Sequence, residues 1–140
     1  MKTVLAFGTF DLLHPGHISY LTQAKALGER LVVVVATDKN VEKIKDRPPV
    51  NDQEHRKELV EALRIVDEAF VGFEDDMIKS VERARPDIVA LGYDHGHDEK
   101  RLRRALESRG ISARVVRLAA YRPELYKSTK IKEKIRSIDS

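Results

Sequence analysis

Two histidines flank a proline and a glycine near the start of the chain, at His14-Pro15-Gly16-His17. An apolar run precedes this segment, and proline is favoured in the first turn of a helix, so we expect a strand followed by a helix N-terminus here. The free N–H groups and the dipole of such a terminus attract anions. Gly16 lets a phosphate approach the backbone, and two histidines three residues apart can donate to the same phosphate. The segment therefore predicts a site that stabilises charge on a transferring phosphoryl group.

Other interpretations of this segment are less favourable. Two histidines near a helix start can be plain surface residues, or they can bind a metal. A metal site normally needs a third ligand, for which Asp11 is the nearest candidate, and phosphate access explains the Pro-Gly pair better. We therefore expect no metal site made by the protein. The segment is not a Walker loop, which needs GxxxxGK[ST], and the chain contains no GxGxxG.

A second group of cations lies in the polar stretch 38–51, which we expect to be a loop. Lys43 and Lys45 in this loop can fold over anionic substrates. Arg56, on the helix that follows, can donate a fork of hydrogen bonds to a phosphate. A solvated charged loop is the alternative, and for Lys43 the residues favour neither interpretation.

Two later segments offer ligand contacts. Asp94 follows the apolar run 87–91 and can accept hydrogen bonds from a ribose or a base. Ser128 and Thr129 at the start of a helix can donate to a phosphate, although capping alone would explain Ser128. Tyr121 can pack on a purine or simply cover the edge of the sheet.

Strand and helix patterns that could position these residues alternate along the chain. Strands are predicted at 3–7, 31–36, 66–71, 87–91 and 113–118, and helices at 15–27, 53–63, 75–84 and 98–108 and after Ser128. This alternation predicts an α/β fold, namely a Rossmann-like, doubly wound five-stranded parallel sheet with helices on both faces. Ligands bind such a sheet beyond the carboxyl ends of its strands, at the switch point of strand order, so the four segments should meet there.

Length and composition restrict the class of protein. A chain of 140 residues without cysteine predicts one domain, 1–140, and excludes disulfides, thiolate metal sites and a cysteine nucleophile. No apolar run approaches the roughly 20 residues of a membrane helix, and no cleavable signal is visible, so we expect a cytoplasmic protein without a membrane partner. The net charge of +3 is too small to suggest nucleic-acid binding. We expect small-molecule partners, and a homodimer remains open.

The segment GTFDxxHPGH resembles the nucleotidyltransferases of the cytidylyltransferase type, whose hallmark is HxGH, and the resemblance covers nearly the whole chain. These enzymes join a nucleoside triphosphate to a phosphate or a phosphate ester and release pyrophosphate. The resemblance implies that His14 and His17 contact the triphosphate and that Thr9 and Phe10 line the nucleotide pocket. It makes 1–140 a single nucleotidyltransferase domain.

Similar enzymes also carry a lysine loop followed by E-x-R, which implies substrate contacts for Lys45 and Arg56, and a G-x-D pattern that matches Asp94. The stretch 121–132 resembles the RTEGISTTKIK signature of glycerol-3-phosphate cytidylyltransferases. Arg122 and Thr129 match that signature in register.

Among the relatives, archaeal FAD synthases resemble the chain most, through RxxxVxAL at 56–63 and PDIxxLGxD at 86–94. This resemblance implies in-line transfer of the AMP moiety of ATP to FMN, with Mg²⁺ carried by ATP and no covalent nucleotidyl-enzyme. The alternatives are a glycerol-3-phosphate cytidylyltransferase, which usually has a tryptophan that this chain lacks, and a heptose-phosphate adenylyltransferase, which has a similar acidic stretch at 73–76. A non-catalytic nucleotide-binding module is a further alternative.

The predicted site has three groups of residues. The predicted catalytic residues are His14, His17, Lys45 and Arg122. The predicted nucleotide contacts are Thr9, Phe10, His14, Pro15, Gly16, His17, Asp94, Tyr121, Ser128 and Thr129. The predicted contacts to the acceptor or to a phosphate are Asp11, Lys43, Arg56 and Lys127.

Overall fold

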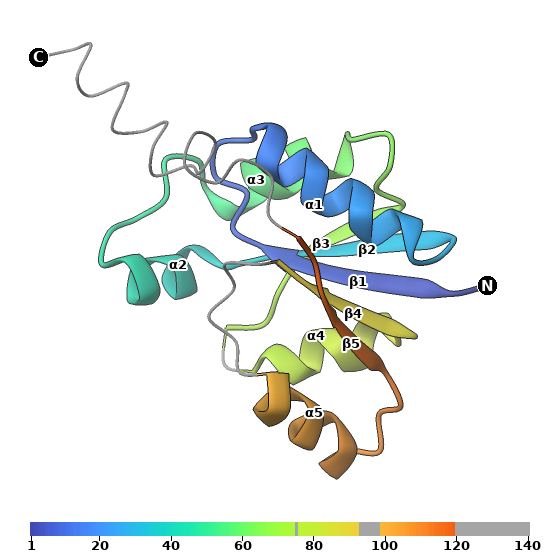
Figure 1. Ribbon diagram of the computed structural model, residues 1–140. Helices are drawn as coiled ribbons and strands as arrows, with labels where there is room; N and C mark the ends of the chain where they lie inside the picture. The colour runs from blue at the N-terminus through green and yellow to red at the C-terminus, as the bar shows by residue number, and fades with distance from the viewer. Residues whose placement is uncertain (75, 93–98, 120–140) are drawn as a thin grey trace, which may run out of the picture.

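A computed structural model describes residues 1–74, 76–92 and 99–119 of the protein. Its five strands are all parallel and form one sheet in the order β3-β2-β1-β4-β5 (Figure 1). The strands are β1 (Thr3–Gly8), β2 (Arg30–Val35), β3 (Glu68–Val71), β4 (Ile88–Leu91) and β5 (Arg114–Arg117). The helices are α1 (Pro15–Ala26), α2 (Asp38–Lys45), α3 (Gln53–Glu61), α4 (Met77–Ala84) and α5 (Glu99–Ser108). The predicted α/β fold is confirmed.

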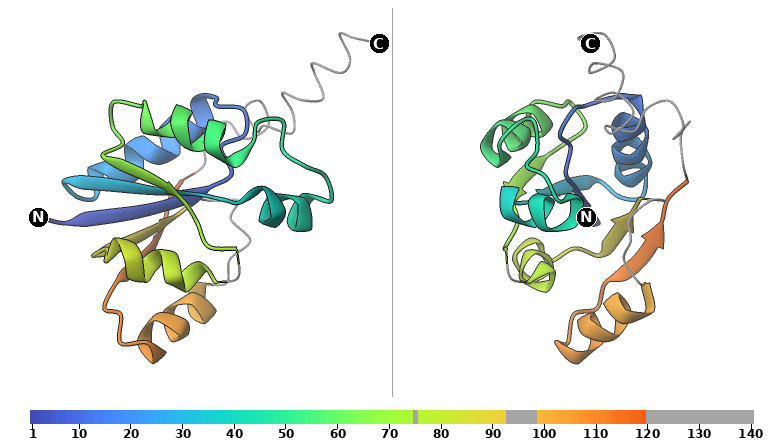
Figure 2. Two further views of the ribbon diagram at one scale, coloured as in Figure 1. Left: turned by 180° about the vertical axis from the view of Figure 1, so that it is seen from behind. Right: turned by 90° about the vertical axis from the view of Figure 1, so that its left-hand side faces the viewer.

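Helices cover both faces of the sheet, with α1 and α3 on one side and α4 and α5 on the other (Figures 1 and 2). Successive strand residues point to opposite faces, so Val33 packs in the α1/α3 layer and its neighbour Val32 in the α4/α5 layer. Because both layers exclude water, β2 is apolar at every position after Arg30. None of the helices in the described ranges is long and apolar enough to cross a membrane.

The expected loop at 38–51 was wrong in its first part, because these residues begin with the helix α2. Thr37 caps α2 by accepting a hydrogen bond from the backbone N–H of Asn40 at 3.1 Å. Val41 is its buried residue, so the helix has almost no apolar stripe to reveal it in the sequence. The helix predicted after Ser128 lies outside the described residues.

A tyrosine hydroxyl lies between β1 and β4 where their pairing ends. The two strands pair only as far as Ala6 and Ala90. Beyond that point Tyr20 of α1 donates to the Ala90 carbonyl at 2.7 Å and accepts from the Phe7 N–H at 3.0 Å. The hydroxyl thus replaces the next direct bond between the strands. This is the switch point of the sheet, because β2 extends it on one side of β1 and β4 on the other.

We expect Tyr20→Phe to lower the free energy of unfolding by about 1–3 kcal/mol, because it leaves the Phe7 N–H and the Ala90 carbonyl without this partner. Urea unfolding measures the change. Ser108→Ala is the control, since the exposed Ser108 hydroxyl bonds only within its own helix turn, to the Ala105 carbonyl. A Tyr20→Phe loss no larger than that of Ser108→Ala would contradict the bridging role.

Candidate active site

The two histidines of the HxGH segment cap α1. His14 is the N-cap residue, and its Nδ1 accepts from the backbone N–H of Gly16 at 3.1 Å. His17 stands three residues later, and its Nδ1 accepts from the backbone N–H of His14 at 3.3 Å. This arrangement is a capping box, in which Ser or Thr and Glu or Gln are the usual residues. The rings stack with their centroids 3.9 Å apart.

The capping bonds determine where each imidazole carries its proton. A ring nitrogen that accepts a hydrogen bond is unprotonated, so a neutral ring held in this way has its N–H at Nε2. His14 and His17 therefore both act as donors through Nε2, on the side of the ring away from the cap. Two such donors from stacked rings at a helix N-terminus form an arrangement suited to phosphate oxygens. The predicted phosphate contacts themselves stay a prediction.

Burial lowers the pKa of His17 from 6.5 to about 3. Electrostatic interaction with His14 and then with Lys45 lowers the pKa further, and the Asp11 carboxylate opposes these effects. His17 is consequently neutral at physiological pH. The same interaction indicates that Lys45, at the end of α2, lies within electrostatic range of the histidines. Lys43 precedes Lys45 by two residues and so occupies a different face of that helix.

The Phe10 side chain packs in the core against His17 and does not present its ring to a ligand. Its side chain is 2% exposed and belongs to the core on the α1/α3 side, and its ring meets that of His17 edge-on at 5.3 Å. A Cβ on Gly8 would lie 2.6 Å from the same ring, so only glycine fits there. Phe10 also has a φ of 52°, which is strained for a bulky residue. The ring therefore cannot line a nucleotide pocket in this conformation.

Asp11 also differs from its predicted role as an acceptor contact. The carboxylate is buried, and its two oxygens accept from the backbone N–H groups of Val50 and Asn51, each at 2.8 Å. The Asn51 side chain donates in return to the Asp11 carbonyl at 2.9 Å. Asp11 thus fixes the end of the 46–51 segment against the HxGH turn.

Arg56 was predicted to contact a phosphate, but its guanidinium is completely buried. It donates to the Asn51 carbonyl at 2.9 Å and to the Thr9 carbonyl at 2.9 Å. It also donates to Asp38 Oδ1 at 2.6 Å, which makes an ion pair. Each of its nitrogens therefore bonds to a different segment of the protein. Because these acceptors are backbone groups and a paired carboxylate, Arg56 positions the site and does not present its charge to a ligand.

Side-chain hydrogen bonds also fix the chain where β4 and β5 end. Arg117 donates to the Gly92 carbonyl at 2.8 Å and to Glu99 at 2.6 Å, which fixes the end of β4. Gln23 of α1 exchanges two hydrogen bonds with the backbone of Ala119, at 3.1 and 3.2 Å. The predicted site residues beyond these points lie outside the described residues: Asp94, Tyr121, Arg122, Lys127, Ser128 and Thr129.

No group of three or more potential metal ligands exists within the part of the chain that the structure describes. Asp11, the nearest carboxylate to the histidines in sequence, already uses both oxygens on backbone N–H groups.

Comparison with known proteins identifies the family. The model of the cytidylyltransferase-like family matches residues 5–134. The chain belongs to this family. Family membership agrees with the capped HxGH turn at the switch point of the sheet.

Three individual proteins show how similar this chain is to known sequences and structures. The FAD synthase of Ferroglobus placidus is 50% identical over 142 residues, which span 100% of this chain and 91% of that protein. The solved lipopolysaccharide core biosynthesis protein of Thermoplasma volcanium superposes with a TM-score of 0.83 at 43% identity, covering 86% of this chain and 98% of that one. The solved pantoate-beta-alanine ligase of Francisella tularensis has a TM-score of 0.66 at 16% identity, and the superposition covers 94% of this chain and 65% of the ligase. At this identity the similarity shows the fold alone.

The lowered pKa of His17 leads to a prediction for acid unfolding. Between pH 6.5 and about 3, His17 binds a proton in the unfolded chain but stays neutral in the folded chain. The contribution of His17 to the free energy of unfolding is therefore complete above pH 6.5 and is lost as the pH falls toward 3. Gln at this position of a capping box keeps the acceptor for the His14 N–H but cannot titrate.

We therefore expect the unfolding free energy of His17→Gln to fall less steeply than that of the wild type between these pH values. Urea unfolding at a series of pH values provides the measurement. Parallel pH dependences would show that His17 titrates alike in the folded and unfolded chains.

Proposed function

We propose that the protein transfers the AMP moiety of ATP to FMN, giving FAD and pyrophosphate. The observation that carries this proposal is the 50% identity to an FAD synthase along the entire chain. The histidine cap supports it independently, since two fixed N–H donors at a helix N-terminus suit a triphosphate. The substrates are then small molecules found in the cytoplasm, where we place the protein.

The reaction needs no enzyme nucleophile. A phosphate oxygen of FMN, already ionised, attacks the α-phosphorus of ATP, and a new P–O bond forms as the bond from the α-phosphorus to the bridging oxygen of the β-phosphate breaks. The electron pair leaves with pyrophosphate. In such a transfer catalysis consists of positioning and charge stabilisation.

Among the residues that the structure describes, we propose that those of the HxGH turn stabilise the charge on the transferring phosphate. The Nε2–H groups of His14 and His17 donate to phosphate oxygens at the positive end of the α1 dipole. Lys45 contributes a positive charge from the end of α2, within electrostatic range of His17. Mg²⁺ bound to the triphosphate would neutralise part of its charge.

The residues outside the described ranges keep their predicted roles in the proposal. Arg122 adds a second cation at the transferring phosphate, Asp94 contacts the nucleoside, and Ser128 and Thr129 bind a phosphate. The backbone at Thr9 and Pro15 borders the nucleotide, although the Phe10 ring does not.

We expect pyrophosphate release with ATP and FMN in the presence of Mg²⁺, and little with CTP and glycerol 3-phosphate. A coupled pyrophosphate assay with each nucleotide against FMN, glycerol 3-phosphate and heptose phosphate provides the comparison. Heptose phosphate belongs in this panel because the Thermoplasma volcanium relative is described as a lipopolysaccharide core biosynthesis protein. If the protein prefers another pair of nucleotide and acceptor, the assignment of FMN as the acceptor is wrong, whereas the assignment as a nucleotidyltransferase stands.

We expect His17→Ala to lower kcat about 10²–10³-fold, equivalent to about 2.7–4 kcal/mol, and to weaken ATP binding much less. The triphosphate in the ground state keeps the α1 dipole, His14, Mg²⁺ and Lys45. Steady-state kinetics and ATP titration measure the two effects.

Loss of the cap also costs about 1 kcal/mol of stability, so a thermal melt must accompany these assays. His17→Gln is the matched control, because it keeps the capping acceptor but not the ring donor. Near-normal kcat in a folded His17→Ala protein would mean that the histidine is only structural.

A further inference from the structure

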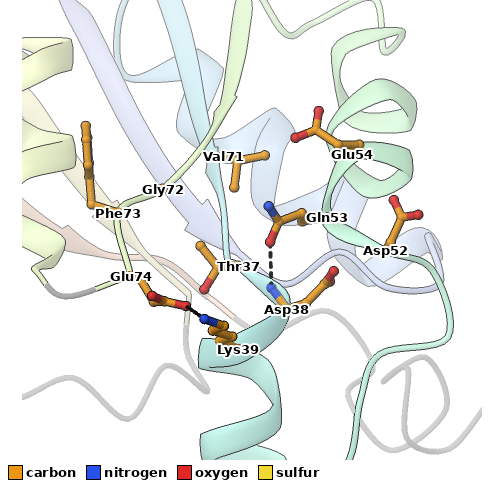
Figure 3. Close-up of a pocket in the computed structure, with 10 residues that line it drawn as sticks. All are labelled: Thr37, Asp38, Lys39, Asp52, Gln53, Glu54, Val71, Gly72, Phe73 and Glu74. Carbon is orange, nitrogen blue, oxygen red and sulfur yellow. Dashed lines mark hydrogen bonds and ion pairs between the residues drawn. The ribbon is translucent and has the colours of Figure 1, made fainter.

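An open groove of about 650 Å³ lies at the carboxyl ends of β2 and β3, where no predicted site residue is found (Figure 3). One wall comes from the starts of α2 and α3, including Thr37 and Gln53. The other comes from the segment that follows β3, including Gly72 and Phe73. Its volume is in the range of small-molecule sites, and the carboxyl ends of parallel strands are where α/β proteins bind ligands.

The groove is next to the HxGH turn. Asp38 in its wall bonds to Arg56 at 2.6 Å, and Arg56 bonds to the Thr9 carbonyl at 2.9 Å. One buried side chain therefore separates the groove from the loop that carries the histidines. A ligand in the groove could extend from there to the phosphate site.

The charge of the groove is unsuited to a phosphate. Its lining contains four carboxylates and one lysine, and the lysine, Lys39, already pairs with Glu74 at 3.6 Å. The helix starts are also occupied by their own caps, because Thr37 accepts from the Asn40 N–H and Asp52 from the His55 N–H. An uncharged ligand with several O–H or N–H donors fits these acceptors, whereas an anion is repelled.

The groove also offers an aromatic surface. Phe73 is 39% exposed and stands at the border of the groove, where Figure 3 shows its ring edge-on. Val71 and Gly72 beside it add an apolar wall with little bulk. A flat aromatic ligand can stack on an accessible ring of this kind.

We propose that this groove binds the isoalloxazine ring and the ribityl chain of FMN, while the FMN phosphate reaches the HxGH turn. The inference rests on the proposed function and adds the acceptor-recognition site. The ring stacks on Phe73, and the ribityl hydroxyls and the ring N–H donate to the carboxylates. The acidic lining repels the triphosphate of ATP, so the two substrates enter in one orientation.

Phe73→Ala tests this assignment. We expect it to raise the KM for FMN about tenfold, with kcat and the KM for ATP changed little, because stacking of this kind is worth about one factor of ten. Phe73→Trp should retain or improve FMN binding, since it keeps an aromatic face. Leu59→Ala is the matched control, an exposed apolar side chain on α3 that does not line the groove.

Riboflavin gives a second readout that does not depend on turnover. It has the ring and the ribityl chain but no phosphate nucleophile, so it can be titrated with ATP and Mg²⁺ present, by its own fluorescence. We expect Phe73→Ala to weaken riboflavin binding by the same factor and Leu59→Ala to leave it unchanged. Phe73→Leu, which keeps apolar volume at the position, should behave like Phe73→Ala.

The outcomes separate the two proposals. If the wild type forms FAD but the FMN KM and the riboflavin affinity are unchanged in Phe73→Ala, the groove assignment is wrong. If the wild type forms no FAD from ATP and FMN, the proposed function fails. In that case the riboflavin titration still decides whether the groove binds a flavin.

Discussion

The hydrogen bonds from two backbone N–H groups to histidine Nδ1 atoms are the interactions on which the site depends. A helix needs acceptors for its first N–H groups, and here the acceptors are His14 and His17. The same bonds that stabilise α1 place both ring protons at Nε2 and hold the rings stacked. The helix therefore uses one edge of each imidazole, and the opposite edge, where we propose that phosphate binds, carries a donor that is fixed before any ligand arrives.

A second set of buried contacts holds the loops around this cap. Arg56 connects the Thr9, Asp38 and Asn51 segments, and Asp11 connects the HxGH turn to Asn51. Burying a guanidinium is unfavourable unless its donors are satisfied, so the arrangement is stable only when all three segments are in place. The loops are consequently coupled to one another, although they come from distant parts of the chain. This coupling gives an irregular region the rigidity that positioning catalysis requires.

Local pattern was sufficient to predict the sheet and its covering helices from the sequence. The apolar run of β2, the Pro-Gly start of α1 and the Asp52 cap of α3 each indicate their element within a few residues. The same local view missed α2, whose single buried residue gives no periodicity.

The roles of Asp11 and Arg56 could not be predicted from local pattern either, because the sequence does not show whether a charged residue faces a ligand or a backbone group 39 or 47 residues away. Their partners are Val50 for Asp11 and Thr9 for Arg56, and only the fold brings them together. The Tyr20 hydroxyl is a similar case, since its contacts with Phe7 and Ala90 depend on the strand order. The roles of such residues are recognised from their burial and their hydrogen-bond partners in the structure, and not from the residue type.

The neutrality of His17 has a consequence for the proposed catalysis. An imidazolium would bind the triphosphate and the released pyrophosphate more strongly, but binding that is equal in the ground state and the transition state does not raise kcat. A neutral Nε2–H donor interacts more weakly with the ground state and responds to the charge that develops during transfer. The low pKa of His17, caused mainly by burial, keeps it in that form across the physiological range. Phe10 meets the His17 ring edge-on and so supplies part of that burial, which gives this strained aromatic residue an indirect role in the chemistry that we propose for His17.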